Sequence, residues 1–364
     1  MKLQTYARRA ATAGILAIAL CAPVHADAGA QERLAEVFDS QVADGFTGYV
    51  IVMRDGEVLY ENGAGSARQE SSSGREFNIA MSADTQFDMA SITKTVTGAL
   101  AAEQIAAGHL DAHAPLETYL DVAGSPIAPL TMHQLLTHTA GLVDILGEDE
   151  EAVSLEEIVV RATGTALLSE PGEAYRYSNL GYSLAAAVLE RVTGQSYEAL
   201  VVETLSRHGA ASTGYALAYD PDRSALNDEG AGVMELSWGG HPPGGNLIGN
   251  GGLVTTASDL AAWLQAYSSA ELVSEAARDL ARTPFVDETG EGRSYYGYGM
   301  VVEEDERLGT IYWHNGGSWH FNAHWREFAD QNVLIIALAD QPPSPADRMV
   351  VRMQRALFAE TVEP

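Results

Sequence analysis

Cysteine is nearly absent, because the 364-residue sequence contains only Cys21. That residue lies in an N-terminal segment that we expect to be removed. The remaining chain then has no disulfide framework, no thiol nucleophile and no cysteine metal site. Such a chain tolerates an oxidising compartment without depending on one.

Residues 1–26 are predicted to be an export signal. A basic start (Lys2, Arg8 and Arg9) precedes an apolar run at 10–22, and the segment ends in Val-His-Ala, a small-x-small cleavage pattern. An uncleaved membrane anchor is the alternative, although the run is short for a spanning helix. We expect a periplasmic or secreted protein without stable membrane association after cleavage.

Positive charge is also scarce. Removal of the signal leaves 18 basic against 50 acidic residues, a formal net charge of −32. Such a surface repels nucleic acid and anionic lipid, so neither is expected as a partner. The excess is most simply explained by solubility, and it carries no information about the fold.

The order of the predicted elements indicates an α+β fold. Strand-like runs lie at both ends of the chain, and helical patterns fill the middle. We therefore predict an antiparallel sheet domain from residues 31–86 plus 250–360, flanked by N- and C-terminal helices. A mainly helical domain, 87–249, is inserted, and the active site is expected where the two meet.

Several local patterns support this division. Asp55-Gly56 between two apolar runs predicts a hairpin. The last helix is expected to start with Ser344 as its cap and Pro345 at its first position. The other expected elements are helices at 31–42, 92–107, 131–137, 180–206 and 255–265, and strands at 295–303, 310–315, 321–328 and 332–340.

Lysine is as informative by its rarity as cysteine, because only Lys2 and Lys94 occur. Lys94 follows Ser91 by three residues at the predicted start of a helix, so both side chains share one face. A neutral lysine amine can remove a proton from a serine hydroxyl, whereas a guanidinium cannot. Burial and the helix dipole both favour the neutral amine. Ser91 and Lys94 therefore form a candidate nucleophile and base.

Two further motifs offer polar groups to the same cleft. Tyr177-Ser178-Asn179 precedes a predicted helix, and His314-Asn315-Gly316-Gly317 lies in a strand-like segment. Either motif alone is weak, since a tyrosine in a loop usually packs and a histidine beside a tryptophan is usually a core residue.

Together, FDMASITK, YSN and HNG resemble the penicillin-recognising serine hydrolases. That family includes class C β-lactamases, D-alanyl-D-alanine carboxypeptidases, D-aminopeptidases and β-lactamase-like carboxylesterases. LLTHTAGL and GNGGLVTTASDLAAW also resemble family segments, and the resemblance runs from about residue 31 to 358.

The resemblance implies a role for each matching position. Ser91 is the expected acylated nucleophile, and Lys94 its general base. Tyr177 is expected to share the role of general base with Lys94 and to donate the proton to the leaving group. Asn179 is expected to hold Lys94 and contact the substrate, while the N–H groups of Ser91 and Gly317 form the oxyanion hole.

The third motif departs from the family pattern. His314 stands where many relatives have lysine, and Asn315 replaces a hydroxyl residue; both, with Gly316 and Gly317, are expected to bind substrate. A neutral imidazole holds a substrate carboxylate less well than lysine. We expect the bulky Trp319-His320 pair to narrow the acyl pocket. We therefore favour a small ester or a short peptide-like amide as substrate over a β-lactam.

The sequence leaves other functions open. A D,D-peptidase or a β-lactamase would use the same nucleophile, and a non-catalytic relative would bind peptidoglycan fragments or β-lactams. No Glu-x-x-Leu-Asn motif occurs, which disfavours a class A β-lactamase. No Gly-x-Ser-x-Gly motif occurs either, which disfavours an esterase of the α/β-hydrolase type. No cofactor is expected. His314, His320 and His324 could suggest a metal, but none is predicted; His138 is expected to fix a turn.

Overall fold

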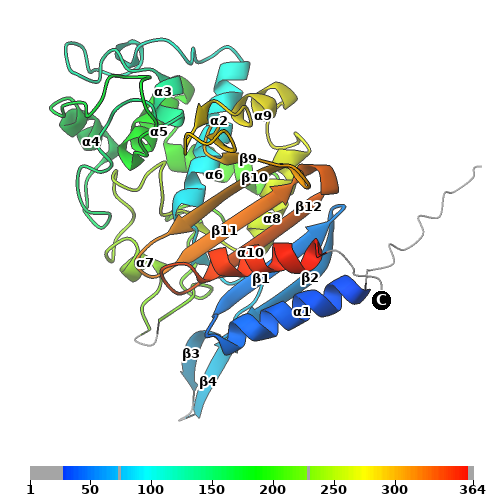
Figure 1. Ribbon diagram of the computed structural model, residues 1–364. Coiled ribbons are helices and arrows are strands. Elements are labelled where there is room, and N and C mark those ends of the chain that lie inside the picture. Colours follow the sequence, from blue (N-terminus) through cyan, green and yellow to red (C-terminus); the bar gives the residue numbers. More distant parts are fainter. Residues whose placement is uncertain (1–27, 73–74, 228–229, 360–364) are drawn as a thin grey trace, which may run out of the picture.

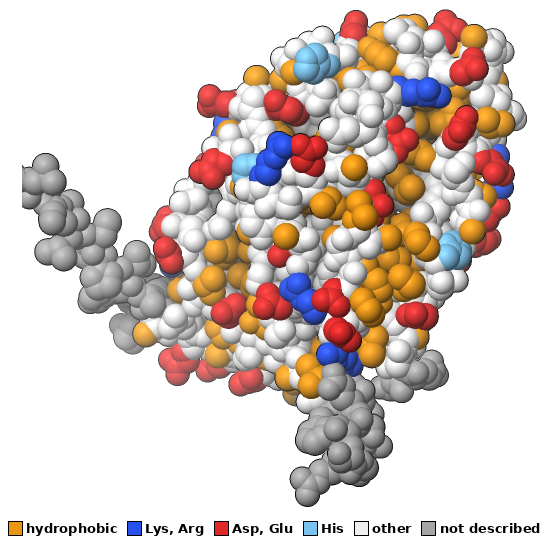
Figure 2. All heavy atoms as spheres, turned by 180° about the vertical axis from the view of Figure 1, so that it is seen from behind, with side chains coloured by type: hydrophobic (Ala, Val, Ile, Leu, Met, Phe, Trp, Pro, Cys, Tyr) orange, Lys and Arg blue, Asp and Glu red, His pale blue; other side chains and the backbone are white. Residues whose placement is uncertain are grey.

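The computed structural model describes residues 28–72, 75–227 and 230–359 (Figure 1). The predicted export signal and its cleavage site lie outside this part of the chain. Within the described residues, no helix is both long and apolar enough to cross a membrane. The face of the molecule in Figure 2 carries many acidic and few basic side chains, as the composition leads one to expect.

An eight-stranded antiparallel sheet joins the two ends of the chain, in the order β2-β1-β12-β11-β10-β9-β8-β7 (Figure 1). The C-terminal strand β12 pairs with β1, so the α+β prediction is confirmed. The strands are β1 Gly48–Arg54, β2 Glu57–Ala64, β7 Val286–Asp287, β8 Ser294–Tyr296, β9 Val301–Asp305, β10 Gly309–Gly317, β11 Asn322–Phe328 and β12 Val333–Ala339. The predicted hairpin turn at Asp55 and Gly56 connects β1 to β2, and both residues have positive φ.

Both faces of the central strands are buried. On β1, Val50 and Val52 contact one hydrophobic cluster, and Ile51 and Met53 contact another. Alternate residues of a strand point to opposite faces, so a strand that is apolar throughout needs a layer on each side. Helices supply both layers.

The helices α1 (Ala28–Ala43) and α10 (Pro345–Leu357) cover one face (Figure 1). α10 begins at Pro345 as predicted, but the Ser344 side chain does not cap it. The Oδ1 atom of Asn322 accepts from the N–H groups of Ala346 and Asp347 instead, at 2.8 and 3.3 Å. The predicted cap was therefore wrong, because a side chain on β11 reaches the helix start.

The second face is covered by α8 (Ala257–Ser268) and the largely helical part of the chain. Its other helices are α2 Thr93–Ala106, α3 Met132–Leu136, α4 Leu155–Ala162, α5 Asn179–Thr193, α6 Tyr197–Ser206, α7 Val233–Leu236 and α9 Glu275–Ala281. The single helix predicted at 180–206 is two helices, because Gly194 adopts a left-handed conformation (φ 72°) and ends α5. The single strand predicted at 295–303 is also divided, into β8 and β9.

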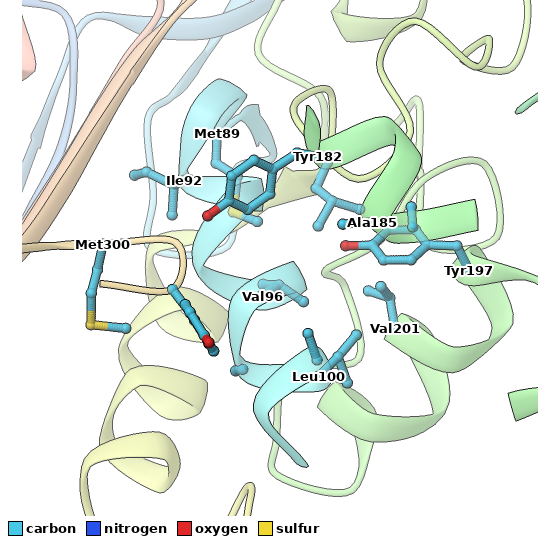
Figure 3. Packing of buried hydrophobic residues seen from close by; sticks show 14 of the residues in the cluster. Met89, Ile92, Val96, Leu100, Tyr182, Ala185, Tyr197, Val201 and Met300 are labelled. Atoms are coloured by element: carbon cyan, nitrogen blue, oxygen red, sulfur yellow. The ribbon is translucent and has the colours of Figure 1, made fainter. Parts of the chain in front are cut away.

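The helix α2 occupies the centre of this second layer. Its side chains meet those of α5 and α6 (Figure 3), and the hydroxyl groups of Thr97 and Tyr197 lie 2.5 Å apart. Against its other side lies the backbone of residues 298–299. A Cβ atom at Gly98 would lie 2.0 Å from the Tyr298 carbonyl oxygen, so only glycine permits this approach.

Replacing Gly98 should therefore destabilise the protein. Helix propensity favours Gly98→Ala, but overpacking against rigid backbone costs about 1–3 kcal/mol, so we expect a net loss of unfolding free energy. Urea unfolding followed by circular dichroism measures it. Gly164→Ala is the control, since its Cβ would meet only Arg161 O, at 3.6 Å. Equal stability of the two variants would contradict the close packing.

Candidate active site

Ser91 lies in a short 3₁₀ turn, Ala90–Ile92, that leads directly into α2. Ala90 has φ 44°, an uncommon conformation for alanine, and its N–H donates to the buried carboxylate of Asp88 at 2.7 Å. Burial raises the pKa of Asp88 to about 6. This contact fixes the backbone immediately before the serine.

The Lys94 amine is fully buried and has three polar neighbours. Nζ lies 2.6 Å from Asn179 Oδ1, 2.7 Å from the Asn250 carbonyl oxygen and 3.1 Å from Ser91 Oγ. The amide orientation of Asn179 follows from its Nδ2 group, which donates to the Asp144 carboxylate at 3.1 Å. The Asn179 Oδ1 atom and the Asn250 carbonyl oxygen therefore both accept from Lys94.

Either form of the amine can bond to these neighbours, and in the neutral form the base is ready to act. The two N–H groups of the neutral form satisfy Asn179 and Asn250, which leaves the lone pair for the Ser91 hydroxyl proton. Burial lowers the pKa of Lys94 from 10.5 to about 7, although the Asp144 and Asp149 carboxylates oppose part of that shift. Near neutral pH a large share of the amine is therefore unprotonated beside the serine.

The YSN segment is fixed by its own helix cap and by His138 from a different loop. Ser178 caps α5 by accepting from the Gly181 N–H at 3.0 Å. The Ser178 N–H in turn donates to Nδ1 of His138 at 3.1 Å. Burial lowers the pKa of His138 well below its usual value, so the ring is a neutral acceptor. The prediction that His138 bonds backbone is confirmed, and its target is the loop that carries Tyr177.

Tyr177 reaches the same centre. Lys94 Nζ lies 4.9 Å from the centre of its ring. Burial raises the pKa of the Tyr177 phenol, while a hydrogen bond with the Ser91 hydroxyl lowers it in part. The phenol is therefore protonated at neutral pH and in contact with the serine.

Strand β10 runs past the serine turn. A Cβ at Gly316 would lie 2.3 Å from the Met89 carbonyl oxygen and 2.9 Å from the Ser91 nitrogen, so a larger residue would push the strand away. At Gly317 the same position is open. The buried Asn322 Nδ2 donates to the Gly316 carbonyl at 2.9 Å and holds the end of the strand.

His314 is buried on this strand and both its ring nitrogens are engaged. Nδ1 lies 2.5 Å from the Asn315 carbonyl and must donate to it, so Nε2 accepts from the Tyr296 hydroxyl at 2.9 Å. Burial and the nearby Lys94 lower the pKa of His314 to about 3. The imidazole is neutral, and in this arrangement no N–H of it is free for an anion.

The Asn315 side chain of this motif faces away from the serine. The Asn315 side chain donates to Asp347 of α10 at 3.1 Å, and His324, its partner across the strands, contacts the same carboxylate at 2.6 Å. His314 pairs with Trp325, so His314 and His324 project from opposite faces of the sheet. The histidines considered as metal ligands are thus separated by register.

Two pockets meet at Ser91. One, of about 300 Å³, contains Tyr177 and His314. The other, of about 70 Å³, contains Asn179 and the exposed Trp319. Gly316 lines the first pocket and Gly317 lines both. The eight predicted site residues therefore lie together; Lys94 contacts Ser91 and Asn179 from beneath without lining either pocket, and the Asn315 side chain turns away.

Sequence reasoning missed several residues that organise the site. Asp144 orients Asn179, Asn250 supplies a carbonyl to Lys94, and Tyr296 engages His314. Asp144 follows the recognised LLTHTAGL segment by two residues and could have been suspected. A backbone carbonyl has no sequence signal, because every residue has one.

A sequence profile of the Beta-lactamase family matches residues 34–360. The chain belongs to the Beta-lactamase family. The resemblance inferred from FDMASITK, YSN and HNG is confirmed, and relatives in this family are serine hydrolases.

Curated relatives carry different activities in their names. Penicillin-binding protein 4* of Bacillus subtilis (strain 168) is 25% identical over 324 residues, 81% of this chain and 68% of that protein. Esterase EstB of Burkholderia gladioli is 34% identical over 220 residues, 53% of each chain. The D-alanyl-D-alanine-carboxypeptidase/endopeptidase AmpH of Escherichia coli (strain K12) is 27% identical over 244 residues, 62% of this chain and 59% of that one. The chain thus spans between half and about two thirds of these relatives.

Solved structures share the fold. EstCE1, a hydrolase with promiscuous acyltransferase activity, has a TM-score of 0.77 at 21% identity, covering 92% of this chain and all of that one. A class C β-lactamase mutant has a TM-score of 0.73 at 16% identity, covering 90% and 97%. These likenesses agree with the predicted β-lactamase/transpeptidase-like fold.

The state of Lys94 predicts the pH dependence of any reaction at Ser91. Below about pH 7 the amine is protonated and cannot accept the serine proton, so kcat/KM should fall about tenfold per pH unit and level off above pH 7. Initial rates with a neutral p-nitrophenyl ester between pH 5 and 9 measure it. A midpoint near the ordinary lysine value of 10.5, or a flat profile, would contradict the assignment.

Proposed function

We propose that the protein is an exported serine hydrolase that forms an acyl-enzyme at Ser91. The observation that carries the proposal is the buried Lys94 amine, which lies 3.1 Å from Ser91 Oγ and donates to two other oxygens, so that its neutral form can accept the Ser91 proton. A purely structural lysine would be costly to bury without a charged partner, so this placement supports a catalytic role.

The reaction proceeds in two stages. Ser91 Oγ attacks the carbonyl carbon while Lys94 Nζ accepts its proton, and the N–H groups of Ser91 and Gly317 receive the negative oxygen. The proton passes through the Tyr177 phenol to the departing oxygen or nitrogen as that bond breaks. Water then attacks the acyl-enzyme, gives its proton back through the same groups, and releases the acid and Ser91.

A neutral or cationic ester, or a peptide-like amide, suits the site best. Neither pocket is lined by lysine or arginine, and His314 is neutral with both nitrogens engaged. A substrate carboxylate, such as that of a β-lactam, therefore meets no positive group among these residues. The names of relatives such as Esterase EstB support a carboxylesterase, and D-aminopeptidase or D,D-carboxypeptidase activity shares the chemistry.

Replacing Lys94 tests the proposed base. Lys94→Arg keeps a positive charge but cannot be deprotonated, so kcat/KM for a p-nitrophenyl ester should fall by about 10²–10⁴. Ser91→Ala provides the inactive baseline. Lys94→Met, similar in length and uncharged, should be equally slow if the missing group is the base. Wild-type rates in Lys94→Arg would refute the role, provided that circular dichroism shows native folding.

Covalent labelling separates the open functions. We expect a fluorophosphonate to label Ser91 readily. A fluorescent penicillin should label it weakly, because no positively charged side chain lines the two pockets to bind the penicillin carboxylate. Mass spectrometry of tryptic peptides locates the adduct, and Ser91→Ala is the control. Strong labelling by the penicillin would favour a D,D-peptidase or β-lactamase. Labelling by neither reagent would favour a non-catalytic binding protein.

A further inference from the structure

The larger of the two pockets at Ser91 combines one carboxylate with several aromatic rings. It measures about 300 Å³, and its only acidic residue is Glu288. No lysine or arginine is among the residues that line it. Its aromatic side chains are Tyr175, Tyr177 and Tyr296, whereas the Trp313 ring stacks on His324, on the opposite face of the sheet from His314.

Glu288 is held in place by hydroxyl groups and not by a cation. Tyr175 donates to its Oε1 at 2.9 Å and Ser294 to its Oε2 at 2.7 Å. The hairpin that carries it is also fixed, since the neighbouring Asp287 accepts from the N–H groups of Gly290 and Gly292 at 2.8 and 2.7 Å. Hydrogen bonds from hydroxyls leave the negative charge in place and each oxygen with accepting capacity.

The charge of Glu288 is felt at the reacting centre. It is one of the groups that raise the pKa of Tyr177, after burial itself. His314, on the same pocket wall, is neutral and offers no compensation. The pocket therefore has a negative potential beside the phenol that we assign as proton donor.

A carboxylate next to aromatic faces is the chemistry that recognises alkylammonium groups, because the ring faces and the carboxylate both attract a cation. The Tyr177 side of Ser91 is also the side from which the leaving group takes its proton. We propose that this pocket binds an ammonium group on the alcohol or amine leaving group of the substrate. The inference rests on the proposed hydrolase function and adds the charge and position of the recognised group.

The general acidity of the protein does not account for this arrangement. On the other side of Ser91 the smaller pocket also has carboxylates, those of the buried Asp88 and of Asp149 and Glu150, but Trp319 is the only aromatic residue among those that line it. Glu288 is partly buried among rings, so salt screens its interactions less than those of an exposed carboxylate. The competing explanation is that Glu288 serves only to join Tyr175 to the hairpin.

Two substrates of equal shape distinguish recognition from a structural role. Acetylcholine and 3,3-dimethylbutyl acetate share the acetyl group and differ in that a quaternary nitrogen replaces a carbon. Acid release in a pH-stat gives kcat/KM for both, in wild type, Glu288→Gln and Glu291→Gln. Glu291 lies on the same hairpin and outside the pocket lining, so its variant loses the same charge elsewhere.

We expect the cationic-to-neutral ratio of kcat/KM to fall about tenfold in Glu288→Gln relative to wild type, and to change little in Glu291→Gln. Comparing ratios cancels the different intrinsic reactivity of the esters. The drop should shrink at high salt. Rates on the neutral ester should stay within a few fold, because glutamine can still accept from Tyr175.

Other outcomes are equally decisive. An unchanged ratio in Glu288→Gln, or an equal loss on both esters, would assign Glu288 a structural role and overturn the inference. A preference that follows a trimethylammonium placed in the acyl group would overturn the position assigned to it. Hydrolysis of neither ester, nor of p-nitrophenyl acetate, would instead count against the proposed hydrolase itself.

Discussion

The site depends on the burial of one amine that has no carboxylate among its hydrogen-bond partners. Lys94 is surrounded by an amide oxygen and a carbonyl oxygen, which stabilise either form of the amine, while burial penalises the charged form. A carboxylate in place of Asn179 would raise the pKa of Lys94 and remove the base. The close packing of α2 at Gly98 and Gly299 fixes the helix that carries Lys94.

Segments distant in sequence are fixed by a second set of contacts around the reacting groups. Asp144 orients Asn179, His138 holds the backbone at Ser178, and Asn322 ties the end of β10 to α10. Around Asp144 and His138, backbone hydrogen bonds such as Leu180 N–H to the Asp144 carbonyl reinforce these side-chain contacts. The precision of the site thus comes from polar groups that never touch a substrate.

Local sequence patterns predicted the local structure well and failed where distant residues intervened. The Asp55-Gly56 turn, the helix after Ser91 and the start of α10 at Pro345 follow from the chain itself. The cap of α10 does not, because Asn322 lies on another strand. The domain boundaries predicted at residues 87 and 249 stay a prediction.

The sequence alone determined which chemistry is available: a rare lysine one helical turn from a serine, followed by a tyrosine, an asparagine and a histidine in a recognisable order. Only the tertiary structure decided the state of these groups, since a pKa depends on burial and on neighbours. In the folded protein the Asn315 side chain bonds to Asp347, and both ring nitrogens of His314 bond to Tyr296 and Asn315. No lysine or arginine lines the pocket beside Glu288. Strand register and packing, which bring side chains from different elements together, set those contacts.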